Sequence, residues 1–128
     1  MRLLLDTHLL LWAVAESRRL PGGARALLED PGNDVYFSAA SIWEIAIKSS
    51  LRRRDFRVDM DALRAVLPKM GLTELPVSAA HAAGVVDLAP IHGDPFDRML
   101  VAQSIAEPLI LLTNDAVLAR YSDGVRVV

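Results

Sequence analysis

Four carboxylates occupy comparable places along this chain. Asp6 directly follows the apolar residues 3–5, and Asp115 follows a second apolar run. Glu44 and Asp97 each lie in the first turn of a predicted helix. Gathered together, the four would repel one another and raise each other's pKa, a conflict that a hard cation such as Mg²⁺ or Mn²⁺ relieves. Such a site suits phosphoryl chemistry, because the metal neutralises a phosphate and lowers the pKa of a bound water.

Each acid also has a purely structural explanation. Asp6 and Asp115 could each cap the helix that follows, since Asp is a favoured N-cap residue. The pattern Ser41-x-x-Glu44 fits a capping box. Residues 94–97, Asp-Pro-Phe-Asp, fit an Asp N-cap followed by proline and a second acid in the first helical turn. The two explanations differ in whether the four acids converge.

The elements that must position these acids alternate between strands and helices. This pattern predicts an α/β fold with a parallel, helix-covered sheet. In such a sheet the carboxyl ends of the strands and the starts of the following helices share one edge, so all four acids could meet in one cleft. The predicted strands are residues 3–5, 35–37, 72–77, 109–113 and 125–128. The predicted helices are residues 9–15, 24–29, 41–48, 59–70, 78–86 and 96–106, with a short one after Asp115.

The totals favour a single domain over residues 1–128. Hydrophobic residues make up 52% of the chain, which is enough for a well-covered sheet, and no linker or repeat divides it. The absence of cysteine excludes disulfides and thiolate chemistry, and is typical of a cytoplasmic protein. The net charge is −2, but acids committed to a metal would leave the remainder net positive.

The N-terminus has some features of a secretory signal, since residues 9–14 are apolar and Ala13-Val14-Ala15 resembles a cleavage site. Asp6 and His8 interrupt the apolar region that a signal needs. No apolar run approaches the ~20 residues that span a bilayer. We therefore expect a cytoplasmic protein without a membrane partner.

Four motifs occur in order along the chain. They are Leu4-Leu5-Asp6-Thr7, Ser41-x-x-Glu44, Asp94-Pro95-Phe96-Asp97-Arg98-x-Leu100-x-Ala102-Gln103 and Thr113-Asn114-Asp115. Taken together, they resemble the PIN-domain ribonucleases, and most nearly the VapC-type toxins of bacterial toxin–antitoxin pairs. The resemblance covers the whole chain, and the motif from Asp94 to Gln103 is its most specific part.

The resemblance implies a three-layer α/β/α sandwich around a mostly parallel sheet of about five strands, with the first strand central. It implies an acidic quartet that binds Mg²⁺ or Mn²⁺ and cleaves RNA, formed here by Asp6, Glu44, Asp97 and Asp115. It also implies supporting residues that orient the ligands or bind the metal through water: Asp94, Thr113 and Ser41. The implied partners are the RNA substrate, a second copy of the chain in a homodimer, and a small antitoxin. The antitoxin would fill the acidic cleft, often with a basic side chain, and bind operator DNA through its own domain.

Arginines are the candidate RNA contacts, because the guanidinium group suits bidentate phosphate binding. They are Arg98 and the cluster Arg52, Arg53 and Arg54, with Arg57 nearby. The histidines His8, His81 and His92 have no spacing typical of a zinc site, and His92 is placed in a loop. Trp12 and Trp43 lie in apolar helical stretches and are predicted to be core residues.

Two other functions compete with the nuclease. A phosphoryl-accepting receiver domain also has acids at strand ends, but it needs a lysine near the last functional strand. Lys48 and Lys69 are the only lysines, and neither is placed there. A catalytically silent binding module, whose acids only cap helices, is the second. The presence of all four acids favours the nuclease.

Overall fold

The computed structural model describes residues 1–51 and 57–128 and contains a five-stranded parallel sheet of order β3-β2-β1-β4-β5. Its strands are β1 (Arg2–Leu5), β2 (Asp34–Ser38), β3 (Leu72–Leu75), β4 (Ile110–Thr113) and β5 (Val125–Val127). All pairings are parallel, and in the register Leu5 lies between Phe37 and Leu112. The predicted α/β class and the central position of the first strand are therefore confirmed.

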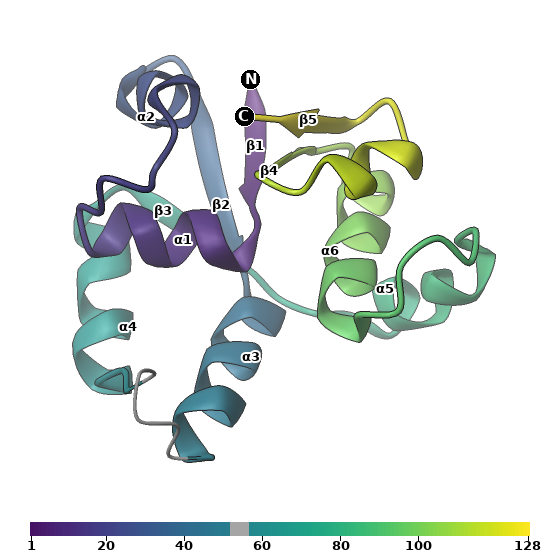
Figure 1. Ribbon diagram of the computed structural model, residues 1–128, viewed down its shortest axis with the longest axis horizontal. Coiled ribbons are helices and arrows are strands. Elements are labelled where there is room, and N and C mark those ends of the chain that lie inside the picture. The colour runs from purple at the N-terminus through teal and green to yellow at the C-terminus, as the bar shows by residue number, and fades with distance from the viewer. Residues whose placement is uncertain (52–56) are drawn as a thin grey trace.

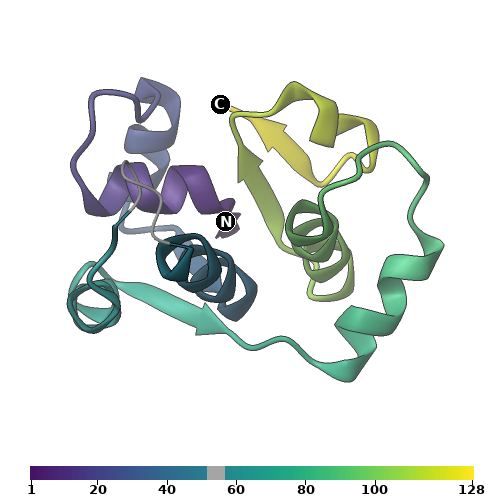
Figure 2. The same ribbon diagram turned by 60° about the horizontal axis from the view of Figure 1, so that its bottom comes forward.

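Helices cover both faces of this sheet, which gives the expected α/β/α layers (Figures 1 and 2). The helices are α1 (Thr7–Val14), α2 (Gly22–Glu29), α3 (Ala39–Ser50), α4 (Met60–Lys69), α5 (Ala79–Gly84) and α6 (Pro95–Ala106). Two 3₁₀ helices, η1 (Val85–Asp87) and η2 (Ala116–Arg120), complete the described part of the chain. Figure 1 shows α1, α2 and α4 on one side of the sheet and α5 and α6 on the other.

The alternating side chains of β1 join two separate cores. Leu3 and Leu5 pack with residues of α1, α2, α3 and α4, whereas Leu4 packs with residues of α6 and η2. All three leucines are completely buried. A strand buried on both faces needs an uninterrupted apolar run, and this explains why β1 and β4 were recognisable from sequence.

The start of α3 differs from the prediction. The helix begins at Ala39, and Ser38 caps it by accepting a hydrogen bond from the Ala40 N–H at 3.0 Å. Ser41 is therefore inside the helix, where its hydroxyl accepts a hydrogen bond from the Thr7 hydroxyl at 2.9 Å. The capping-box explanation of Glu44 is wrong, because the serine that ends β2 already caps the helix. Glu44 consequently lies in the second turn.

Other boundaries shift by a few residues. Helix α1 starts at Thr7, directly after its cap Asp6, rather than at residue 9. Strand β3 ends at Leu75, before Pro76, rather than at residue 77, and it is an edge strand of the sheet. Among residues 1–51 and 57–128 no helix combines the length and apolarity required to cross a bilayer.

Candidate metal centre

Asp6 lies where β1 ends, and both of its carboxylate oxygens are held. Oδ1 accepts the Leu9 N–H at 2.8 Å and thereby caps α1, while Oδ2 accepts the Thr113 hydroxyl at 2.6 Å. The Thr113 oxygen in turn accepts the Asp115 N–H at 3.0 Å. Burial raises the pKa of Asp6, although these hydrogen bonds oppose the shift. Asp6 therefore both caps α1 and presents its carboxylate at the edge of the sheet where the other acids lie.

Asp94 and Asp97 have different roles at the start of α6. Asp94 is the N-cap, since its Oδ1 accepts the N–H groups of Phe96 and Asp97 at 2.8 and 3.2 Å. Burial raises the pKa of Asp97 to about 6, with the charges of Asp94 and Glu44 adding to the shift and His92 opposing it. The carboxylate of Asp97 is thus placed among other acids without serving as the cap.

Glu44 is a buried carboxylate, only 3% exposed. Its Oε2 is 2.5 Å from the Nζ of Lys48, one helical turn further along α3. Its Oε1 is buried without a hydrogen-bond partner among the described residues. Leaving a buried acceptor unpaired costs about 1–3 kcal/mol, and more when the group is charged. A cation bound beside Glu44 would supply the missing partner.

The sheet edge opens into a cavity of about 380 Å³, whose lining includes Asp6, Asp97 and Asp115. Asp115 caps η2 through the Val117 N–H, yet one oxygen each of Asp97 and Asp115 and one ring nitrogen of His92 lie within 4.8 Å of one another. Three acids of the predicted quartet thus line one cavity, and Glu44 is close enough to shift the pKa of Asp97. Hard oxygen donors of this kind suit Mg²⁺ or Mn²⁺.

His92 is the residue that the sequence did not single out. Its Nε2 lies 3.4 Å from Asp115 Oδ2 and 3.8 Å from Asp97 Oδ2. The one local signal is its position two residues before the helix cap Asp94, whose backbone N–H donates to His92 Nδ1 at 3.0 Å. Its approach to Asp115 depends on the folding of a distant strand end and is not readable from spacing.

A family model of the PIN domain matches residues 3–124 of the chain. The chain belongs to the PIN domain family. No individually curated protein matches it at a significant level.

Solved structures support the fold of this PIN domain. VapBC2 from Rickettsia felis, in a crystal structure with a DNA fragment from its promoter, aligns with a TM-score of 0.70 and 16% identity over 100% of this chain and 98% of that one. FitAcB from Neisseria gonorrhoeae aligns with a TM-score of 0.63 and 20% identity over 98% and 95%. FitAB bound to the IR36 DNA fragment aligns with a TM-score of 0.59 and 17% identity over 98% and 94%.

Arg98, predicted as an RNA contact, makes hydrogen bonds within the PIN domain. Its guanidinium donates hydrogen bonds to the carbonyls of Ala89 and Val85 at 3.0 and 3.2 Å and to the Tyr121 hydroxyl at 3.1 Å. These three hydrogen bonds give Arg98 a structural role, and its contact with RNA stays a prediction. Arg52, Arg53 and Arg54 lie outside the described residues.

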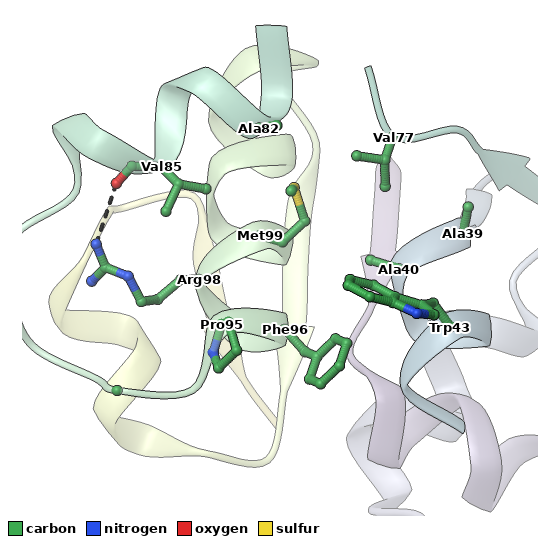
Figure 3. A pocket seen from close by; sticks show the side chains of 11 residues that line it. Ala39, Ala40, Trp43, Val77, Ala82, Val85, Pro95, Phe96, Arg98 and Met99 are labelled. Atoms are coloured by element: carbon green, nitrogen blue, oxygen red, sulfur yellow. Dashed lines mark hydrogen bonds between the residues drawn. The ribbon is translucent and has the colours of Figure 1, made fainter. Parts of the chain in front are cut away.

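An apolar groove of about 640 Å³ lies between α3 and the α5–α6 pair (Figure 3). Trp43 and Phe96 face each other across it, with ring centroids 5.2 Å apart. Trp43 is 63% exposed, so its predicted place in the core is wrong, whereas Trp12 packs against the core as expected. Each groove aromatic immediately precedes an acid of the quartet, so the groove and the acidic cavity share α3 and α6.

The raised pKa of Asp97 makes the stability of the metal-free PIN domain depend on pH. Between the ordinary value of 3.8 and about 6, the folded protein keeps a proton that the unfolded chain releases, so the free energy of unfolding falls as pH rises through this window. Asp97 is 23% exposed, and with solvent screening we expect a loss of about 1–2 kcal/mol. Urea unfolding in EDTA should show a smaller decrease over this window in Asp97→Asn, because asparagine does not titrate. An equal decrease in the free energy of unfolding of Asp97→Asn and wild type over this pH window would contradict the prediction.

Proposed function

We propose that this PIN domain is a metal-dependent endoribonuclease that hydrolyses RNA phosphodiester bonds and acts as the toxin of a toxin–antitoxin pair. PIN domains are generally nucleases, so family membership supports the hydrolytic part. The observation that carries the proposal is a buried oxygen of Glu44 that has no hydrogen-bond partner among residues 1–51 and 57–128, beside a cavity lined by Asp6, Asp97 and Asp115. Neither Glu44 nor Asp97 is the cap of its helix, so helix capping does not account for these two carboxylates.

Each acid has a definable part in this chemistry. Asp6, Asp97 and Asp115 would hold one or two Mg²⁺ or Mn²⁺ ions, and Glu44 would complete the ligand set or orient the attacking water. When bound, the cation would neutralise the phosphate and lower the pKa of the attacking water. Water attack forms a P–O bond and breaks the bond from phosphorus to the 3′ oxygen, which takes the proton. The products are a 5′-phosphate and a 3′-hydroxyl.

The supporting residues orient the acids, or the elements that carry them, through hydrogen bonds. Thr113 fixes one oxygen of Asp6 and, by accepting the Asp115 N–H, ties together the ends of β1 and β4. Asp94 fixes the first turn of α6 and therefore the direction of Asp97. The Ser41 hydroxyl accepts a hydrogen bond from the Thr7 hydroxyl and so links the beginnings of α1 and α3. These contacts hold the strand ends and helix starts that carry the four acids.

The silent module remains the second candidate, because Asp6, Asp94 and Asp115 do cap helices. Capping does not account for Asp97, whose pKa is raised by burial, nor for Glu44, whose Oε1 is buried without a hydrogen-bond partner in the described part of the chain. This difference favours the nuclease.

The antitoxin partner is supported by the two neighbouring surfaces. The acidic cavity offers a site for a basic side chain, and the groove lined by Trp43 and Phe96 offers one for apolar side chains. Of the three aligned structures, VapBC2 and FitAB were determined with DNA, which is consistent with an antitoxin that binds operator DNA itself.

The homodimer draws support from α5 and η1. The predicted helix of residues 78–86 exposes most of its alanines, and Val86 is 84% exposed. Packing in the core does not account for these side chains. A second copy of the chain is the proposed partner for this surface.

Cleavage of an end-labelled mixed RNA pool tests the function. Protein freed of any antitoxin by denaturation and refolding should cleave RNA in Mg²⁺ or Mn²⁺, stop in EDTA and resume when the metal is restored. Asp6→Asn should remove the activity, because the variant loses a negative ligand at the sheet edge. Cleavage that survives in EDTA or in Asp6→Asn would exclude this site as its source. If no RNA is cleaved and wild type binds Mn²⁺ no better than Asp6→Asn, the silent module is the better assignment.

A further inference from the structure

The loop that carries His92 is anchored from two other parts of the fold. The Tyr121 hydroxyl accepts the His92 N–H at 2.7 Å and donates to the His92 carbonyl at 3.3 Å. Arg98 donates to the same hydroxyl, to the carbonyl of Val85 in η1 and to the carbonyl of Ala89 in the loop before His92. Figure 3 shows the Arg98 side chain reaching the Val85 carbonyl. The backbone of His92 is therefore fixed by residues of α6 and of the segment after η2.

The hydrogen bond to the ring determines what His92 can do. Nδ1 accepts the Asp94 N–H at 3.0 Å, so it presents a lone pair there and the ring proton lies on Nε2. Nε2 faces Asp115 Oδ2 and Asp97 Oδ2 at 3.4 and 3.8 Å. A nitrogen that carries a proton cannot ligate a metal, but it can donate to carboxylates. The geometry therefore distinguishes His92 from the oxygen ligands beside it.

We infer that His92 is a positioning residue: its Nε2–H donates to Asp115 Oδ2, the nearer of the two carboxylate oxygens that it faces, and thereby sets the direction in which Asp115 and Asp97 present their Oδ2 atoms to the cation. The inference rests on the proposed function for the presence of that cation. Carboxylate ligands are commonly oriented by such outer hydrogen bonds, and removing the donor costs about 10–100-fold in metal affinity. Arg98 and Tyr121 act one step further away, by holding the loop that presents the imidazole.

The first test measures Mn²⁺ affinity by calorimetry, a readout that does not require RNA. His92→Ala should weaken Mn²⁺ binding about tenfold or more. His92→Gln should recover most of the loss, because its amide offers an N–H in place of Nε2–H. Thermal unfolding in EDTA establishes that both variants are folded. Equal affinity in His92→Ala and wild type would overturn the inference, as would an equal loss in the alanine and glutamine variants.

A second test removes only the anchor of the loop. Tyr121→Phe deletes the hydroxyl that holds His92 and should weaken Mn²⁺ binding severalfold while the ring of His92 is retained. Tyr36→Phe is the matched control, since Tyr36 lies on β2 and its contact with Arg2 is through the aromatic ring. Tyr36→Phe should bind Mn²⁺ like wild type. Identical affinities for the two phenylalanine variants would contradict the role of Tyr121.

Comparing two metal ions distinguishes a His92 that donates a hydrogen bond to the carboxylates from a His92 that ligates the metal. Imidazole ligands favour Co²⁺ over Mg²⁺, so a ligating His92 would make His92→Ala lose Co²⁺ affinity far more than Mg²⁺ affinity. A positioning role predicts a similar fold loss for both ions. Failure of the proposed function is recognised separately: wild type and Asp6→Asn would then bind Mn²⁺ equally poorly. Strong Mn²⁺ binding that depends on Asp6 but not on His92 would overturn only the inference about His92.

Discussion

The variant Asp97→Asn is expected to lose about 1000-fold in kcat/KM for RNA cleavage while retaining the fold. Asp97 lines the acidic cavity without capping α6, so its negative charge is available to a cation rather than to the helix. A catalytic cation contributes several kcal/mol of charge stabilisation in the transition state, and each 1.36 kcal/mol corresponds to a factor of ten in rate. Asparagine keeps the shape of the side chain but removes the charge.

The same substitution should leave the metal-free protein at least as stable as wild type at neutral pH. The pKa of about 6 means that ionised Asp97 is unfavourable in the folded protein, and asparagine removes this cost. Loss of activity with unchanged or increased stability would show that the carboxylate serves function rather than folding. Initial cleavage rates and urea unfolding in EDTA measure the two quantities.

Asp94→Asn is the matched control, three residues earlier in the chain. Its oxygen accepts two backbone N–H groups, and asparagine is an equally good N-cap residue. We expect its activity to fall less than tenfold, through small changes in the direction of Asp97. A larger loss in Asp94→Asn than in Asp97→Asn would reverse the assignment of the two acids.

Strands and helix starts could be predicted from the sequence where their burial or capping requires a short, distinctive pattern of residues. The apolar runs of β1 and β4 are buried on both faces, so no polar residue interrupts them and their ends are visible as Asp6 and Thr113. The start of α6 was equally readable, because an Asp cap followed by proline has one favourable arrangement.

Caps, side-chain directions and distant contacts could not be predicted where the sequence of a segment is compatible with several arrangements. Ser38 and Ser41 are both suitable caps for α3, and only the position where β2 ends selects Ser38. The same helix has apolar residues around much of its circumference, so periodicity did not reveal that Trp43 faces the groove while Ile45 is buried. His92 reaches its partners through contacts with Tyr121, which lies 29 residues away, and no local motif encodes that contact.

The second large effect concerns the strand that presents Asp6. Leu5→Ala should lower the free energy of unfolding by about 3–5 kcal/mol, the range for leucines truncated in a well-packed core. Leu5 is completely buried and, in the sheet register, lies between Phe37 and Leu112. Leu51→Ala is the matched control, because Leu51 is 61% exposed at the end of α3 and should change stability by no more than about 0.5 kcal/mol. Urea unfolding of both variants measures the difference.

The metal affinity of Leu5→Ala shows whether the packing of Leu5 affects only the stability of the fold or also the position of the Asp6 carboxylate. Asp6 is held by the Leu9 N–H and the Thr113 hydroxyl, and its own N–H donates to the Leu112 carbonyl at 3.0 Å. None of these contacts involves the Leu5 side chain, so Leu5→Ala should bind Mn²⁺ within about tenfold of wild type wherever it remains folded. Loss of Mn²⁺ binding as severe as in Asp97→Asn, with the protein still folded, would show that core packing rather than the hydrogen bonds of Asp6 sets the position of that carboxylate.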